Sequence, residues 1–250
     1  MIREYYLLGV VLAFLAWSGV GLRHLTAGLT GSFTAAAKQA DTVRWQPNPD
    51  RGTATSTLSG GRRGSAVSRC AIAPDTLNTQ MTLLVPQHHE GLLTTAATPR
   101  VAWSLETAEP VTMRLVLTHP EQANPVYTTT LTADATGLAT VTLPELSLGT
   151  QYRWTVFVAC GQDSEIYARS FIERVEANPE WTRLEPQSAL EQAALYANAG
   201  IWYDTLNTLL DHYHQSQQPN TLAALSTLLT DAQPGQSVPA AALLTRIISE

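Results

Sequence analysis

Hydrophobic and polar residues alternate with a period of two between residues 81 and 175, which is the pattern of half-buried strands. In the clearest run, Val111, Met113, Leu115 and Leu117 share one face of the predicted strand. Turn-rich links separate seven such runs, and this spacing predicts an antiparallel β-sandwich. The runs are Met81–Val85, Arg100–Leu105, Thr112–Thr118, Val126–Leu131, Leu138–Leu143, Gln151–Ala159 and Glu165–Ile172.

A tyrosine marks one predicted corner of this sandwich. The segment LSLGTQYRW places Tyr152 at the start of a strand, directly after a Leu-x-x-Gly-Thr corner. It looks like the corner tyrosine of fibronectin type III and immunoglobulin-like sandwiches, whose hydroxyl holds the preceding loop. Tyr152 and Trp154 would then face the core, with Cys160 at the strand end.

After Glu176 the apolar positions recur with helical spacing. A capping box at Ser188–Glu191 predicts a helix over Ser188–Asn198, and a second helix follows over Ile201–His214. Pro219 opens a third helix. The segment Ser237–Pro239 predicts a fourth, whose apolar side carries Leu243, Leu244, Ile247 and Ile248.

These patterns predict an α+β fold: an immunoglobulin or fibronectin III-like antiparallel β-sandwich followed by a small helical-hairpin subdomain of tetratricopeptide-like packing. The expected organisation is a signal peptide or anchor at 1–37 and a flexible basic Gly/Ser/Thr-rich linker at 38–69. The sandwich is expected at 70–176 and the helical subdomain at 177–250. The apolar run Leu7–Val20 favours a cleaved export signal, with an uncleaved anchor as the alternative.

The segment YANAGIWYDTL, Tyr196–Leu206, joins two predicted helices through a glycine. Trp202 and Tyr203 are neighbours on a helix, so one is expected to pack inward and the other, with Asp204, to be exposed to a partner. In the alternative interpretation, both seal the joint between the subdomains. The candidate partner-binding residues are Tyr196, Gly200, Ile201, Trp202, Tyr203 and Asp204.

The net charge and the two cysteines limit the class of partner and the redox state that we expect. The net charge of −6 argues against nucleic acid as the main partner. Two cysteines in an exported chain, Cys70 and Cys160, are most simply one disulfide, with two buried free thiols as the alternative.

The sequence predicts no enzyme, no cofactor and no metal site. There is no G-x-S-x-G elbow for a serine nucleophile. The clusters His88–Glu90 and Asp211–His214 lack the spaced partners of a closed metal site. Glu173 and Glu176 are expected to pair with Arg169 or Arg174.

Five segments together resemble one family. They are GGRRGSAVSRC, LLVP, YRWTVFVAC, FIERVE and YANAGIWYDTL, and the resemblance covers about Arg51 to Leu229. In this order they are similar to the mainly cyanobacterial family catalogued as domain of unknown function 928. The resemblance implies an exported protein and no assigned activity.

We therefore expect an exported, non-enzymatic binding or assembly module in the periplasm or at the cell surface. Its partner would be an unknown envelope protein, and it would touch the membrane only through an uncleaved N-terminal segment. One alternative is a carbohydrate-binding sandwich, which predicts Trp103 or Trp45 exposed on a sheet face. Another is a self-assembling surface subunit, in which the arm Asp41–Arg69 adds a strand to a neighbour's sheet.

Overall fold

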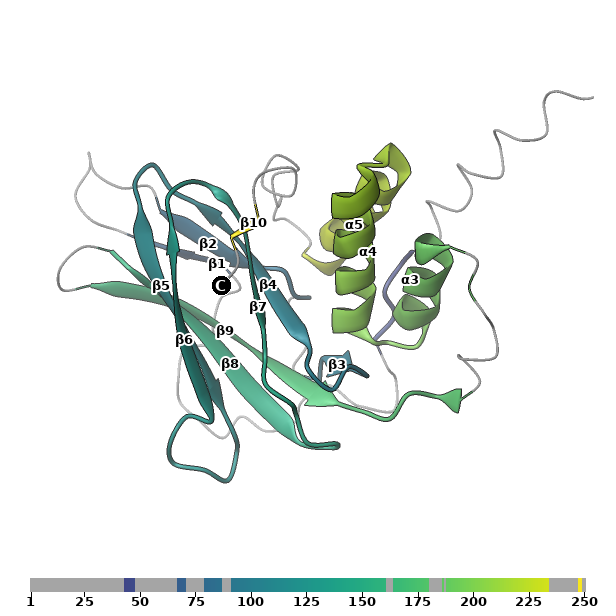
Figure 1. Cartoon of the computed structure of the whole chain (residues 1–250), viewed down its shortest axis with the longest axis horizontal. Helices are drawn as coiled ribbons and strands as arrows, with labels where there is room; N and C mark the ends of the chain where they lie inside the picture. The colour runs from purple at the N-terminus through teal and green to yellow at the C-terminus, as the bar shows by residue number, and fades with distance from the viewer. Residues whose placement is uncertain are drawn as a thin grey trace, which may run out of the picture.

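Two five-stranded sheets and three helices make up the described part of the chain (Figure 1). The computed structural model describes residues 43–47, 67–70, 79–86, 91–160, 164–179, 186, 188–233 and 247–248. The strands are β1 (Val67–Arg69), β2 (Gln80–Leu83), β3 (Leu93–Thr94), β4 (Arg100–Glu106), β5 (Val111–Thr118), β6 (Tyr127–Ala133), β7 (Gly137–Thr142), β8 (Gln151–Ala159), β9 (Glu165–Arg174) and β10 (Ile247–Ile248). The helices are α3 (Ala189–Asn198), α4 (Trp202–Ser216) and α5 (Pro219–Ala232).

The strand order is β1-β2-β4-β7-β10 in one sheet and β3-β9-β8-β5-β6 in the other. The indoles of Trp103 on β4 and Trp154 on β8 lie between the sheets, with ring centroids 6.5 Å apart. Trp103 also donates its Nε1–H to the sulfur of Met113 on β5, 3.2 Å away. All three side chains are fully buried, so the two sheets share one core. Each of the seven predicted runs corresponds to one of the strands β2 and β4–β9.

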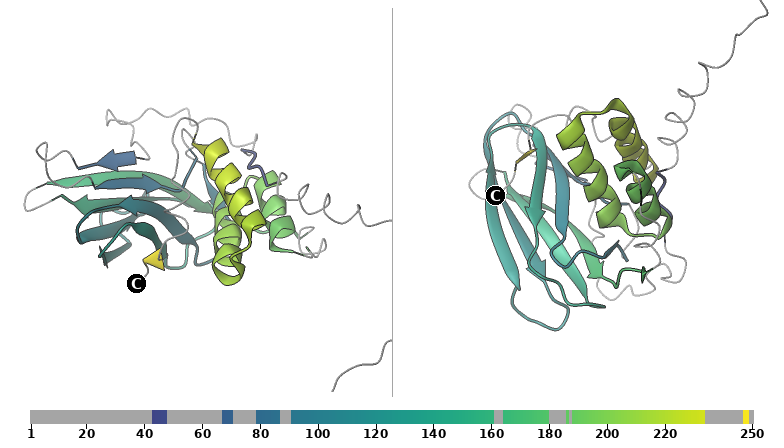
Figure 2. Two further views of the ribbon diagram at one scale, coloured as in Figure 1. Left: turned by 90° about the horizontal axis from the view of Figure 1, so that it is seen from above. Right: turned by 45° about the vertical axis from the view of Figure 1, so that its right-hand side comes forward.

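The helices lie beside one end of the sheets, and the two further views in Figure 2 show them as a separate layer. Their bounds confirm the first three predicted helices to within a few residues. Gly200 has a φ of 76° between α3 and α4, a left-handed conformation that glycine adopts without steric cost. None of the described helices is long and apolar enough to cross a bilayer.

The fourth predicted helix is wrong at its end. Ile247 and Ile248 form β10, which pairs in parallel with Leu138 and Ala139 of β7. The β-branched isoleucines suit a strand, and the edge of β7 supplies backbone partners that the local sequence cannot reveal. Residues 237–246, where this helix was expected to begin, lie outside the described residues.

The predicted linker is partly built into the fold. Val67–Arg69 pairs antiparallel with β2 of its own chain, and Val43 is fully buried. Trp45 packs edge-on against Trp202, with centroids 5.5 Å apart. The expectation of a solvated tether is therefore wrong at these positions, because Val43 and Trp45 pack against the core and Val67–Arg69 forms a strand. The predicted signal or anchor at 1–37 and residues 48–66 lie outside the described residues.

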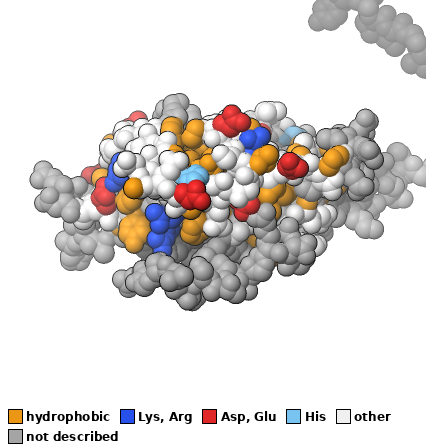
Figure 3. Space-filling view, turned by 90° about the horizontal axis from the view of Figure 1, so that it is seen from below, with side chains coloured by type: hydrophobic (Ala, Val, Ile, Leu, Met, Phe, Trp, Pro, Cys, Tyr) orange, Lys and Arg blue, Asp and Glu red, His pale blue; other side chains and the backbone are white. Residues whose placement is uncertain are grey.

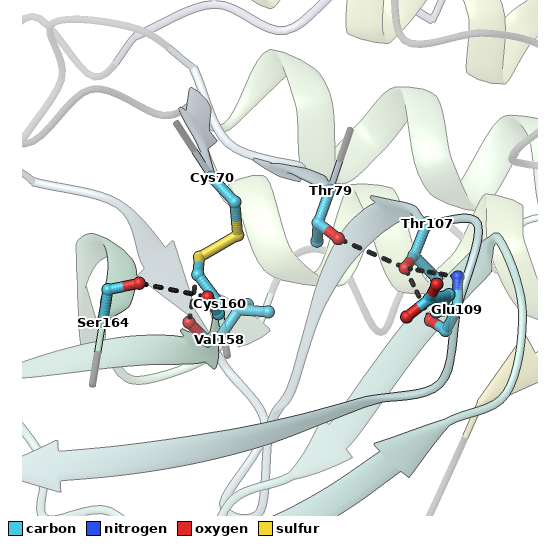
Figure 4. The surroundings of a disulfide bond; sticks show 7 residues. All are labelled: Cys70, Thr79, Thr107, Glu109, Val158, Cys160 and Ser164. Atoms are coloured by element: carbon cyan, nitrogen blue, oxygen red, sulfur yellow. Dashed lines mark hydrogen bonds between the residues drawn. A yellow bond between two sulfur atoms is a disulfide. The ribbon is translucent and has the colours of Figure 1, made fainter. Parts of the chain in front are cut away.

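The predicted disulfide between Cys70 and Cys160 is confirmed, with the two Cα atoms 5.6 Å apart (Figure 4). Cys70 follows β1 in one sheet and Cys160 follows β8 in the other. The Ser164 hydroxyl donates to the Cys160 carbonyl oxygen at 3.1 Å. The disulfide thus fastens the two sheets together at one end.

Candidate functional site

The first turn of α4 contacts both sheets. Trp202 donates its indole N–H to the backbone oxygen of Leu84, 3.0 Å away, at the end of β2. Trp202 and Tyr203 each have 0% of their surface exposed. The prediction that one of the two faces solvent is therefore wrong. The sheets, Trp45 and α3 surround the first turn of α4. The side chains of Trp202 and Tyr203 point to different sides of the helix, and both sides are covered by protein.

The hydroxyl of Tyr203 joins α4 to β8 and β9, two neighbouring inner strands of the second sheet. It accepts the indole N–H of Trp154 at 2.8 Å and donates to the backbone oxygen of Phe171 at 2.7 Å. Burial raises the pKa of Tyr203 well above its usual range. The side chain therefore stays neutral and acts as a structural bridge between β8, β9 and the helix.

Asp204 fastens the same turn to β3. Its carboxylate accepts the Thr95 backbone N–H at 2.6 Å and the hydroxyls of Thr94 and Thr95 at 3.3 Å each. Burial raises the pKa of Asp204, while the hydrogen bonds from Thr95 and Thr94 act in the opposite direction.

The remaining predicted residues complete this joint. Gly200 and Ile201 are buried, and Tyr196 is half-buried on α3. The structure thus brings the six predicted residues together, but it turns the side chains of Ile201, Trp202 and Tyr203 inward. Trp202 and Tyr203 belong to the same buried cluster as the core of the sandwich.

Asp204 gives a pH prediction. Because its folded-state pKa is raised above 3.8, its favourable contribution is complete below that value and is lost as pH rises through the folded pKa. Asp204→Asn removes this titration and can still accept the Thr95 N–H. We expect wild-type stability to rise relative to Asp204→Asn as pH falls from about 7 to about 4. Denaturant unfolding of both proteins over this range tests it; a constant difference would contradict it.

A second surface, on the outer side of the second sheet, is exposed. Alternation along β8 turns Trp154 and Val156 into the core and therefore Phe157 outward. The register places Arg114 of β5, Phe157 of β8 and Tyr167 of β9 side by side. The Arg114 guanidinium lies 4.3 Å over the Phe157 ring, and the Phe157 and Tyr167 rings are 5.9 Å apart.

Two further arginines extend this surface. Arg153 is exposed opposite Phe171, and Arg169 is half-exposed opposite Thr155. Neither guanidinium has a hydrogen-bond or ion-pair partner among the residues that the structure describes. We call the set the arginine–aromatic face; it consists of Arg114, Arg153, Phe157, Tyr167 and Arg169.

The arginine–aromatic face was not predicted from the sequence. A signal was present, because the period of two in β8 and β9 puts Arg153, Phe157 and Tyr167 on the side where short polar residues are usual. On the face of the molecule that Figure 3 shows, basic and acidic side chains are scattered among polar and hydrophobic ones. The arginine–aromatic face is distinguished by the local grouping of its arginine and aromatic side chains, and not by the net charge of the chain.

Several other predicted positions have structural roles. Tyr152 accepts the Ser147 backbone N–H on its hydroxyl at 3.4 Å, across the corner before β8. Trp103 is fully buried, so the expectation of its exposure on a sheet face is wrong, and Trp45 is half-buried. Because β4 is buried from Val101 to Leu105, neither face of this strand could expose Trp103.

Within the part of the chain that the structure describes, no group of three or more His, Cys, Asp or Glu side chains could hold a metal ion. His88–Glu90 lies outside the described residues. In the second cluster, Asp211 accepts from Arg100 at 2.6 Å and His212 hydrogen-bonds Thr221 at 2.7 Å. Arg174 pairs with Glu145 at 3.3 Å, a partner that the sequence did not suggest.

Comparisons with known proteins add a family and little more. The family described as Domain of Unknown Function (DUF928) matches residues 58–240. No curated protein matched the chain. Among solved structures, the soluble domain of PmoD from Methylocystis sp. ATCC 49242 (Rockwell) is similar at 12% identity, covering 42% of this chain and 96% of that one, with a TM-score of 0.23.

Proposed function

The chain belongs to the DUF928 family, and from that premise we propose that it is a non-enzymatic binding module of the cell envelope. Its partner is an envelope protein, and the contact surface is the arginine–aromatic face. The helices and the sandwich together act as the rigid support of that face.

The observation that carries this proposal is the exposure of Tyr167. Its surface is 49% exposed, although its ring packs against Phe157 and shares a row with Arg114. Tyrosine and arginine are, with tryptophan, the residue types enriched among interface anchors. A tyrosine held by a neighbouring ring loses little conformational freedom when it binds, so it suits a contact surface.

The side chains at the start of α4 support the same assignment, because their contacts within the chain leave them unavailable to a partner. Trp202, Tyr203 and Asp204 are engaged in contacts within the chain. These contacts hold the helices on the sheets, so a partner would bind to other residues. Tyr203 also donates to the Phe171 carbonyl oxygen of β9, the strand that carries Tyr167, and so fastens that strand to the helix.

Export is supported by the disulfide. Pairs such as Cys70–Cys160 persist in oxidising compartments and are rare in the cytosol. The proposed location is the periplasm or the cell surface. The N-terminal signal that the sequence predicts would deliver the protein there.

Two finer features of the fold belong to the proposal. The orders β2-β4-β7 and β9-β8-β5-β6, with the Tyr152 hydroxyl bonded across its corner, favour a sandwich of the fibronectin III or immunoglobulin kind. The antiparallel run of α3, α4 and α5, joined by short turns, favours a helical hairpin extended by one helix. The predicted units 70–176 and 177–250 then share one core and act as a single unit.

The proposal predicts a specific loss of capture. Tagged protein is crosslinked in its native envelope and recovered beside two variants, Tyr167→Ala and Leu148→Ala. Leu148 is equally exposed at 49% but lies outside the face, which makes it a matched control. We expect a defined protein that is captured by the wild type and by Leu148→Ala and is reduced about tenfold or more with Tyr167→Ala.

Equal capture by the wild type and both variants would show that the contact does not involve Tyr167. An empty eluate from each would contradict the protein-binding function.

Carbohydrate binding is the second candidate, and Tyr167 is the observation that favours it. An exposed ring held by its neighbour can stack on a sugar, and Arg153 could hydrogen-bond hydroxyls. Retention on a glycan array that is lost with Tyr167→Ala would support it. Self-assembly by strand addition has less support, because Val67–Arg69 of the arm pairs with β2 of its own chain.

A further inference from the structure

We propose that the arginine–aromatic face binds an extended, acidic segment of the partner protein, with carboxylates at alternate residues of that segment. This inference rests on the proposed function and specifies its partner. It follows from how the three arginines are spaced, which of them have partners, and what lies beside them.

The three arginines occupy three successive outward rows of the sheet. Arg114 shares a row with Phe157 and Tyr167, Arg169 lies opposite Thr155 in the next, and Arg153 lies opposite Phe171 in the third. Outward residues of a strand are about 6.6 Å apart along its length. An extended peptide that runs along the strands presents every second side chain at the same repeat. The arginines stand on three neighbouring strands, Arg114 on β5, Arg153 on β8 and Arg169 on β9, with β8 in the middle. A peptide that lies over β8 would therefore have Arg153 beneath it and the other two arginines on either side, so that acidic residues at alternate positions would each lie beside one arginine.

The charge state of the face suits carboxylates. Arg153 and Arg169 have no acidic partner among the described residues, and Arg114 shares only the exposed Glu165, 3.4 Å away. A guanidinium presents parallel N–H donors that match the two oxygens of a carboxylate. Three arginines against one glutamate make the face locally positive on a chain of net charge −6. This contrast steers an acidic segment to the face and away from the rest of the surface.

The aromatic pair favours a peptide over a simple polyanion. Tyr167 stands at the end of the first row, half-exposed, with Phe157 beside it. It offers apolar area next to the cations, so a segment that carries an apolar side chain beside its acidic ones would use both. Thr155 shares a row with Arg169, and Thr118 shares a row with Arg153, so a short side chain stands beside each of these two arginines.

Binding of synthetic peptides to the whole protein tests the inference. The probes are a fluorescent peptide of alternating Glu and Thr, a peptide of the same composition with Glu in adjacent pairs, and an alternating Gln and Thr peptide. The variants are Arg153→Glu with Arg169→Glu, and Arg44→Glu as a control with the same change at a side chain that is 69% exposed and outside the face. Anisotropy at low and high salt gives the affinities.

We expect the alternating acidic peptide to bind tightest, and to bind the double variant about tenfold or more weakly, whereas Arg44→Glu changes affinity by less than about twofold. Binding should weaken as salt rises. Equal binding of the Gln peptide, or an equal loss with Arg44→Glu, would overturn the inference. Equal affinity of the paired-Glu peptide would overturn the alternate spacing. Tighter binding of polygalacturonate than of any peptide would assign the face to an anionic glycan and overturn the assignment to a protein segment.

This test separates the inference from the proposed function. If envelope capture depends on Tyr167 but not on Arg153 and Arg169, the partner is a protein and the acidic segment is wrong. If acidic peptides bind as expected but the envelope yields no partner, the chemistry of the face stands and the proposed envelope protein does not.

Discussion

Replacing Trp202 and Tyr203 together by alanine is expected to unfold the protein. Both side chains are fully buried and both hydrogen-bond to the sandwich, at Leu84 and Phe171. Truncating one large buried aromatic costs about 3–5 kcal/mol, and whole domains are stable by only about 5–15 kcal/mol. The loss should appear as a melting temperature about 10 °C or more lower, or as no cooperative transition, in thermal circular dichroism.

Single conservative changes separate the contributions. Tyr203→Phe keeps the ring and removes the hydroxyl, which leaves the Trp154 N–H and the Phe171 carbonyl without this partner. We expect a loss of about 1–3 kcal/mol from these unpaired buried groups. Leu148→Ala, at an exposed site, should change stability little. A double variant that melts like the wild type would contradict the buried joint.

This expectation changes how capture experiments are interpreted. A partner lost with the Trp202 and Tyr203 double variant would report unfolding and would not locate a binding site. Tyr167→Ala is the informative change, because its ring lies on the surface and its removal leaves the core intact. A circular dichroism melt of each variant belongs beside every pull-down.

The strands were predictable because their signals are local. Gln151–Ala159 was predicted with the bounds that β8 has, since Tyr152, Trp154, Val156 and Val158 alternate with polar or outward residues. Turn residues then mark where each strand ends. In contrast, β1 and β10 have three and two residues and form only because β2 and β7 offer edges from distant parts of the chain.

The candidate sites depended on such distant contacts as well. That Trp202 and Tyr203 are both buried follows from two sheets meeting one helix turn, and helical periodicity describes only the helix itself. The outward direction of Phe157 follows from alternation, but its position beside Arg114 and Tyr167 depends on the register between strands. Register is set by the whole sheet, so the sequence pattern could identify the residues and could not bring them together.

The second large effect concerns the disulfide. Cys70 and Cys160 are 90 residues apart, and a link across a loop of that size stabilises a protein by about 4–5 kcal/mol in the chain-entropy model. We therefore expect Cys70→Ser with Cys160→Ser to lower the free energy of unfolding by about 4 kcal/mol. Denaturant unfolding of the wild type with and without reductant should reproduce the difference, while reductant should not affect the double variant.

The contacts near Cys70 bear on whether the lost stability comes from the attachment of β1 or from the constraint on the unfolded chain. The Cys70 N–H donates to the Thr79 oxygen at 3.0 Å, and β1 pairs with β2 over three residues, so some of the attachment survives reduction. If the disulfide only fastened β1, its removal would cost less than about 1 kcal/mol, the range of one ordinary hydrogen bond. A loss near the larger figure means instead that the link constrains the unfolded chain across both sheets. The protein would then keep most of its stability only in a compartment that maintains the disulfide, which connects this measurement to the proposed export.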